Sequence, residues 1–157
     1  SVAMIEEAER RLEHAARLVR EGRRAGRFGL EAAIQSAHAV RRHGLPVPWK
    51  AILSLYDALL ALEPEHEQWT GARVARAVAM GEVAGPEASL DALKVAAAGS
   101  MTYQPYWAAL AEALWRAGRG AEAREALDRS VGLAGDMAVR EFLLAKRARW
   151  AAEGSER

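Results

Sequence analysis

The sequence predicts an all-α fold of stacked antiparallel helical hairpins, with about eight helices and no strand. Alanine, the residue with the highest helix propensity, supplies about a fifth of the 157 residues. Apolar residues recur at steps of three and four along most of the chain, which places them on one stripe of a helix. Glycine and proline stand between these stretches, where helices end and turns begin.

The first half of the chain contains three such stretches. Helices are expected over residues 4–21, with a stop at Gly22, and over residues 30–43, with a stop at Gly44. The segment 44–48, with the sequence GLPVP, follows as a rigid connector, and the next helix covers residues 49–62. The apolar stripe of the first helix consists of Ile5, Ala8, Leu12, Ala15, Ala16 and Val19.

The second half of the chain completes the set of hairpins. Gly85 separates two apolar stretches, and Gly118, 33 residues later, separates two more. Pro86 and Pro105 mark helix starts, because the first helical turn tolerates a missing amide donor. The last helix is expected over residues 136–152, which gives eight helices in four hairpins.

Bulky and small residues alternate in residues 106–134 as they do in tetratricopeptide units, which show Trp-x2-Leu-Gly-x2-Tyr, then Ala-x3-Phe, then Pro over about 34 residues. Trp107, Leu110 and Ala123 match this template. The glycine, tyrosine, phenylalanine and proline are replaced by Ala111, Leu114, Leu127 and Gly135. Small residues let two helices approach closely, and large ones fill the gap beside the next hairpin. We therefore expect one TPR-like superhelical domain over residues 1–157, in which residues 1–3 are consistent with an expression scar.

Charge and composition exclude several classes of protein. The net charge of +1 provides no overall field that would attract nucleic acid or an anionic membrane. The absence of cysteine excludes disulfides and thiolate sites. No apolar run approaches the length of a membrane span, and the amino terminus lacks a signal-peptide core. A cytoplasmic protein is expected, and the basic cluster Arg20, Arg23, Arg24 and Arg27 is interpreted as a solvated helix end.

The sequence shows little sign of catalysis. No metal-ligand signature includes any of the four histidines, His14, His38, His43 and His66, so neither a metal nor another cofactor is expected. His38 is interpreted as a packing residue. One group of titratable residues could serve acid–base catalysis: Glu63, Glu65, His66 and Glu67. These residues flank Pro64 in an expected loop, so a solvated turn is favoured over a catalytic site. Without a Gly-x-Ser-x-Gly elbow or a phosphate loop, the chain is predicted not to be an enzyme.

A binding surface is better supported, because stacked hairpins leave a groove lined by the first helix of each pair. Trp115 lies about 80° around its helix from Trp107. Tryptophan and arginine are enriched at interface hot spots. The candidate groove residues are therefore Trp115, Glu112 and Arg116 on one helix and Arg73 and Arg76 on the preceding one. The alternative is that Trp115 packs against an adjacent helix.

Five phrases occur in a fixed order along the chain: FGLEAAIQSAHA (28–39), WKAILSLYDALLAL (49–62), RAVAMGEVAGPEA (76–88), LWRAGRGAEAREALDRSVGLA (114–134) and REFL (140–143). Together they resemble the carboxy-terminal, tetratricopeptide-like extension of a group of bacterial extracytoplasmic-function-type sigma factors. The chain departs from that family at Val74 and Ala75, where a Leu-Asn pair is usual, and at residues 135–139, where an acidic Asn-x-x-Glu is usual. The promoter-binding regions are absent, so this chain is not expected to direct transcription alone.

The sequence thus predicts a protein–protein interaction and regulatory module, the carboxy-terminal domain of a sigma factor acting in transcription initiation. The resemblance implies a protein partner, namely the sigma-factor regions, RNA polymerase or a regulator. Neither direct nucleic-acid contact nor membrane binding is expected. The alternative is a free-standing adaptor that binds a peptide or protein, and an enzyme of unknown class is the third hypothesis.

Overall fold

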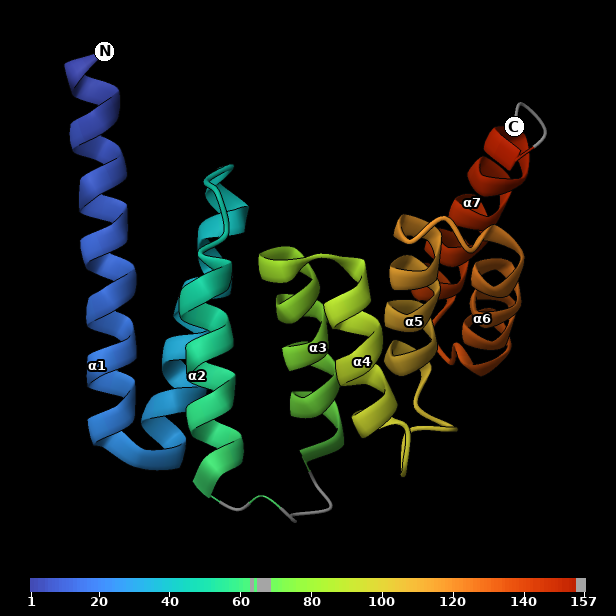
Figure 1. The fold of residues 1–157 in the computed structure, drawn as a ribbon, viewed down its shortest axis with the longest axis horizontal. Coiled ribbons are helices and arrows are strands. Elements are labelled where there is room, and N and C mark those ends of the chain that lie inside the picture. Colours follow the sequence, from blue (N-terminus) through green and yellow to red (C-terminus); the bar gives the residue numbers. More distant parts are fainter. Residues whose placement is uncertain (63, 65–68, 155–157) are drawn as a thin grey trace. The chain divides into compact units, whose positions relative to one another are not determined.

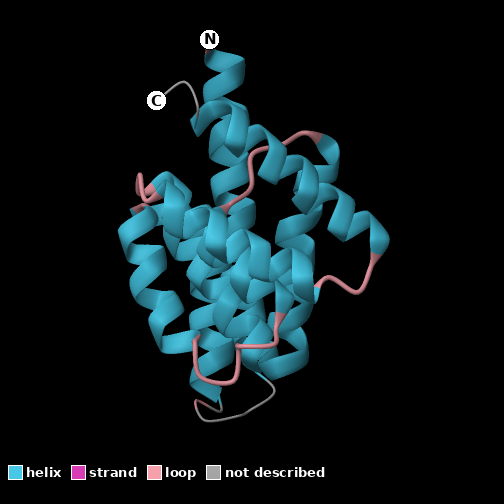
Figure 2. Ribbon diagram, turned by 90° about the vertical axis from the view of Figure 1, so that its right-hand side faces the viewer, coloured by secondary structure: helices cyan, strands magenta, loops and turns pink. Residues whose placement is uncertain are grey.

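The computed structural model describes residues 1–62, 64 and 69–154, and Figure 2 shows that the regular structure of these residues is helical, without a strand. The all-α prediction is confirmed. The elements are α1 (Val2–Ala39), the 3-10 helix η1 (Val40–His43), α2 (Trp49–Leu62), α3 (Thr70–Ala84), α4 (Pro86–Ala96), α5 (Gln104–Arg116), α6 (Gly120–Leu133) and α7 (Met137–Gly154). A kink divides α1 into two helical halves, which correspond to the first two of the eight expected helices. The other six expected helices correspond to α2 to α7.

The chain forms two compact units, Ser1–Ala72 and Arg73–Arg157. Each unit has a hydrophobic cluster of its own, and no residue belongs to both clusters in the described part of the chain. The single domain expected over residues 1–157 stays a prediction, and each unit is described here by itself.

The kink in α1 lies at Gly26, whose φ of 71° and ψ of −158° suit glycine and strain other residues. The chain reverses there, so the two halves of α1 form a hairpin (Figure 1). The predicted stop at Gly22 is therefore wrong. Gly22 is buried within the helix, and a Cβ at this position would lie 3.1 Å from Cδ2 of Leu55. Its lack of a side chain lets α2 come close to α1.

The core of the first unit lies between the second half of α1 and α2. The buried side chains of α2 are Ile52, Leu55 and Leu59, which follow the predicted helical spacing. Leu55 and Leu59 cluster with Leu30 and other apolar residues of α1, and Trp69 completes the cluster. The stop predicted at Gly44 is confirmed, since η1 ends there with Gly44 in the left-handed conformation.

In the second unit, successive helices pack against one another from α3 to α7 (Figure 1). Gly85 and Gly118 both have positive φ angles and form the turns between α3 and α4 and between α5 and α6, as the sequence predicted. Pro86 and Pro105 lie in the first turns of α4 and α5, also as predicted. The hydroxyl of Ser89 on α4 donates to the carbonyl of Ala77 on α3 at 2.9 Å.

The core of the second unit shows the alternation of small and large residues that the sequence predicted. Ala111 and Ala123 are fully buried where α5 and α6 approach each other, and Leu127 is fully buried beside them. Trp107 is only partly buried, with its Nε1 donating to the Met101 carbonyl at 2.9 Å. Small residues thus set the helix separation, and leucines fill the space between the helices.

Candidate functional site

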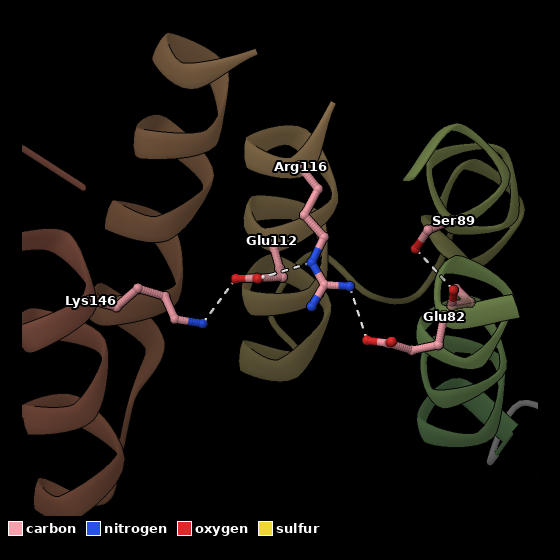
Figure 3. Close-up of polar contacts among 6 residues, drawn as sticks. Glu82, Ser89, Glu112, Arg116 and Lys146 are labelled. Carbon is pink, nitrogen blue, oxygen red and sulfur yellow. Dashed lines mark hydrogen bonds and ion pairs between the residues drawn. The ribbon is translucent and has the colours of Figure 1, made fainter. Parts of the chain in front are cut away.

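The candidate site is a chain of ion pairs that joins three helices of the second unit (Figure 3). The guanidinium of Arg116 on α5 donates from Nη1 to Glu82 Oε1 of α3 at 2.9 Å, and from Nε to Glu112 Oε1 at 3.2 Å. On the other side, Lys146 Nζ of α7 donates to Glu112 Oε2 at 3.0 Å. We call Glu82, Arg116, Glu112 and Lys146 the polar ladder.

The polar ladder follows from helical spacing within α5 and from the order of the helices. Glu112 and Arg116 are four residues apart, so they share one face of α5. Each ion pair between helices joins residues 34 positions apart, Glu82 to Arg116 and Glu112 to Lys146. This separation equals the length of a tetratricopeptide unit. In a chain with that repeat, both pairs would connect equivalent positions of successive hairpins.

The charges of the polar ladder remain accessible. The Arg116 side chain is 49% exposed, and the other three members of the ladder are each about one-fifth to one-third exposed. The hydrogen bond with Glu82 raises the pKa of Arg116, so the guanidinium stays charged. Exposed ion pairs of this kind contribute only about 0–1 kcal/mol each to stability. The polar ladder therefore matters more for the pattern of charge on this face than for folding.

An aromatic stack lies beside the polar ladder. The rings of Trp115 on α5 and Trp150 on α7 are nearly parallel, with an interplanar angle of 3° and centroids 4.6 Å apart. Trp150 is buried and Trp115 is partly exposed. Lys146 Nζ lies 5.8 Å from the Trp150 ring, and the Arg124 guanidinium lies 5.9 Å from the Trp115 ring, so cations border the stack. Trp115 thus packs against an adjacent helix, as the alternative interpretation expected.

The structure brings some of the predicted groove residues together and leaves others apart. Glu112 and Arg116 pair directly. Arg73 and Arg76 are half-buried on α3, nine and six residues before Glu82. By helical rotation they lie about 180° and about 120° around α3 from Glu82. They are therefore not members of the polar ladder.

Sequence reasoning missed Glu82, Lys146 and Trp150. The first two carry a usable signal, because each stands 34 residues from an oppositely charged residue of the predicted groove, Arg116 or Glu112. No comparable signal marked Trp150. Its pairing with Trp115 depends on how α7 packs against the neighbouring helices, which a helical pattern within one segment does not specify.

The described surface of each unit also has hollows. In the first unit, one of about 490 Å³ is lined by Ile34, Tyr56, Trp69 and their neighbours. A shallow depression of about 410 Å³ between α5 and α6 is lined by Trp107, Leu110, Leu114, Glu122, Glu125, Ala126 and Arg129. The Arg129 guanidinium lies 4.6 Å above the Trp107 ring and covers part of this depression. In the first unit, an apolar hollow of about 260 Å³ lies between the first half of α1 and the connector 44–48, with Leu18, Val40 and Leu45 in its walls.

The remaining candidates for chemistry give no catalytic arrangement among residues 1–62, 64 and 69–154. No three metal-ligating side chains gather there. Burial, helped by the positive charge of Arg41, lowers the pKa of His38, which packs edge-on against Trp49 with ring centroids 6.1 Å apart. The predicted cluster of Glu63, Glu65, His66 and Glu67 lies outside the described residues. None of the described helices is long and apolar enough to cross a membrane.

Comparison with known proteins gives one informative match. An uncharacterized protein of Rhizobium meliloti (strain 1021) is 34% identical over 112 residues, which cover 71% of this chain and 26% of that protein. The chain thus spans about a quarter of the length of the relative it matches. No family model matches the chain, and no solved structure matches it.

Proposed function

We propose that this chain is a protein-interaction and regulatory module, the tetratricopeptide-like carboxy-terminal extension of an extracytoplasmic-function-type sigma factor acting in transcription initiation. The polar ladder is the observation that carries the proposal. It extends over α3, α5 and α7, the helices that would line the groove of a tetratricopeptide stack, and its charges remain partly exposed. The two residues of each ion pair between helices are 34 positions apart, which is the spacing of equivalent residues in successive tetratricopeptide units.

The phrases that resemble the sigma-factor extension support the same reading. WKAILSLYDALLAL coincides with α2, and LWRAGRGAEAREALDRSVGLA covers the end of α5, the following turn and α6. The Rhizobium relative supports a module within a longer protein, because the matched stretch makes up only 26% of it. A sigma factor in which such a module follows the promoter-binding regions has this organisation.

The chemistry of the polar ladder suits a protein partner that carries both signs of charge. A partner carboxylate could pair with Arg116 while a partner cation pairs with the glutamate that it displaces, so little charge would be left unpaired on binding. The partly exposed indole of Trp115 adds an apolar contact next to these charges. Aromatic and arginine side chains together are the residues that most often dominate protein interfaces.

A capture experiment tests both the partner and the site. The chain is immobilised, and binding of the sigma promoter-binding regions and of RNA polymerase core is measured separately. We expect Arg116→Ala and Trp115→Ala to weaken capture by about tenfold or more, the effect of losing a hot-spot side chain. Arg119→Ala is the matched control, because it removes the ion pair with Glu122 at the start of α6 and no contact of the polar ladder.

The possible results separate the two parts of the proposal. Capture that is unchanged in both variants, with unchanged far-UV circular dichroism, would contradict the site. Capture of neither sigma regions nor polymerase by the wild-type chain would contradict the sigma-factor function. The genomic reading frame upstream of this segment gives a second test, since a sigma segment is expected there and an in-frame stop codon would contradict the proposal.

A further inference from the structure

The first half of α1 carries an apolar face that the rest of the first unit leaves mostly exposed. Figure 1 shows this half as the long first segment before the kink. Ile5 is 60% exposed and Leu12 is 72% exposed. The helix packs within the first unit through a different side, where Ala15 and Gly22 are buried. We call this row the α1 seam, and its members are Ile5, Ala8, Leu12, Ala16 and Val19. The first four are exposed, and Val19, at the kink end, is half-buried against the core of the first unit and leaves part of its side chain accessible.

The geometry of the α1 seam is that of a helix-pairing surface. Its residues follow one another at steps of three, four, four and three. This spacing keeps them on one side of the helix over about 21 Å. The steps read the same in both directions from Leu12, so the row maps onto itself when the helix is reversed. A row with this symmetry suits an isologous contact between two identical helices.

Charged residues beside the α1 seam select the orientation of such a pair. Six exposed ones lie on one flank, about 60–140° around the helix from Leu12. The flank is acidic towards the amino terminus and basic towards the kink: Glu6, Glu9 and Glu13, then Arg17, Arg20 and Arg24. A parallel twofold pair would place the charged flanks of the two helices on opposite sides of the seam, where they could not pair. An antiparallel pair would place the acidic part of each helix beside the basic part of the other.

We infer that two copies of this chain associate through the α1 seam, antiparallel and with the twofold axis at Leu12. In this register Ile5 faces Val19 of the second copy, and the two Leu12 side chains meet at the centre. Ala8 and Ala16 face each other across the axis, and their small side chains let the helices approach closely. This inference goes beyond the proposed function and does not depend on the identity of the partner of the polar ladder.

The same register brings opposite charges into reach. Glu9 falls level with residue 15 of the second copy, about 3 Å along the axis from Arg17. Glu6 falls at the same distance from Arg20 of the second copy. The twofold axis repeats each contact, so four ion pairs border the seam. Their exposure makes them more important for orientation than for affinity.

The test is the mass of the 157-residue chain in solution, measured by light scattering and by sedimentation over a wide range of concentrations. We expect the wild-type chain to reach twice the monomer mass and Leu12→Glu to remain a monomer. Since the Leu12 side chain is mostly exposed, the variant should keep the far-UV spectrum of a folded chain. Val95→Glu is the matched control, because it also places a carboxylate on an exposed apolar residue, 79% exposed on α4, and should still dimerise.

Charge exchange tests the orientation. Glu9→Arg and Arg17→Glu are each expected to weaken dimerisation, and the double variant should restore it, because the pair is re-formed with reversed signs. A wild-type chain that stays monomeric at all concentrations overturns the inference, and this is the result expected if the seam binds a different helix. An assembly that survives Leu12→Glu overturns it as well. A double variant no stronger than the single ones overturns the antiparallel register.

Discussion

The imidazole of His38 gives the clearest dependence of stability on pH. Burial lowers its pKa in the folded chain, and the charge of Arg41 lowers it further. The unfolded chain, whose histidine has a pKa of about 6.5, therefore takes up the proton first as the pH falls. The stability that the neutral ring contributes is complete above that value, and it is lost as the pH falls through the folded pKa.

We therefore expect the free energy of unfolding to fall less on acidification in His38→Gln than in the wild type. Urea unfolding at a series of pH values from neutral to mildly acidic measures this difference. Arg41→Gln should reduce this fall in the free energy of unfolding only partly, because it removes the charge that contributes to the lowered pKa of His38 and leaves the larger effect of burial. Equal pH dependence in all three proteins would show that His38 is not the group responsible.

Single residues also show where sequence reasoning succeeds and fails. Glu112 and Arg116 were predicted because they flank Trp115 on the helix expected to line the groove, and their four-residue spacing explains why they pair. Gly22 was taken as a helix stop, and its sequence could not show that it lies against Leu55 of another helix. Gly26 carries the same side chain and makes no close contact, yet it holds the kink. The two glycines differ in backbone conformation and in tertiary surroundings, and the local pattern contains neither.

The approach of α4 to α3 depends on Gly81. A Cβ there would lie 2.9 Å from Cβ of Ser89, so one of the two helices would have to move. We expect Gly81→Ala to lower the free energy of unfolding by about 1–3 kcal/mol, the cost of overpacking. Chemical denaturation followed by circular dichroism gives the value.

Gly132 in α6 is the matched control for that substitution. It has no atom of a neighbouring element within 4 Å, so alanine meets open space there. Its higher helix propensity should stabilise the chain by up to about 1 kcal/mol. Substitutions that change stability in the same direction at both positions would contradict the proposed contact between α3 and α4.

Helix positions were predicted well, and the faces through which the helices pack were predicted less well. The bounds of α2 and the turns at Gly85 and Gly118 agree with the sequence, because apolar spacing and glycine are local signals. The apolar stripe predicted from Ile5 to Val19 contains a single buried residue, Ala15. Periodicity shows that a helix has an apolar face, but the available neighbour decides which part of it is covered.

The division into two units leads to a prediction for the second of them. Its buried cluster is drawn from residues 74–150, so all the core side chains lie within one continuous segment. We expect the fragment 70–157 to fold by itself, with a helical far-UV spectrum and a cooperative urea transition. Leu127→Ala, at a fully buried position, should lower its free energy of unfolding by about 2–5 kcal/mol. A fragment without a cooperative transition would contradict the prediction.

Packing between neighbouring helices dominates both units, as it does in solenoid proteins. This is why so much of the fold was readable, since each hairpin is specified by a short stretch of sequence. The polar ladder was readable only in part, because it joins three helices. Its ion pairs depend on the register between successive hairpins, which the pattern within any single helix does not contain.

The requirement at Gly26 is one of handedness. A Cβ there would meet no atom within 4 Å, so bulk is not what excludes other residues. The mirror image of its dihedral angles, φ −71° and ψ 158°, is the common polyproline conformation of ordinary amino acids. A D-amino acid would therefore sit at this position without strain. Among the natural amino acids only glycine, which is achiral, does so. The absence of a chiral centre at residue 26 therefore decides whether residues 2–39 fold back into a hairpin or extend as a rod about 57 Å long.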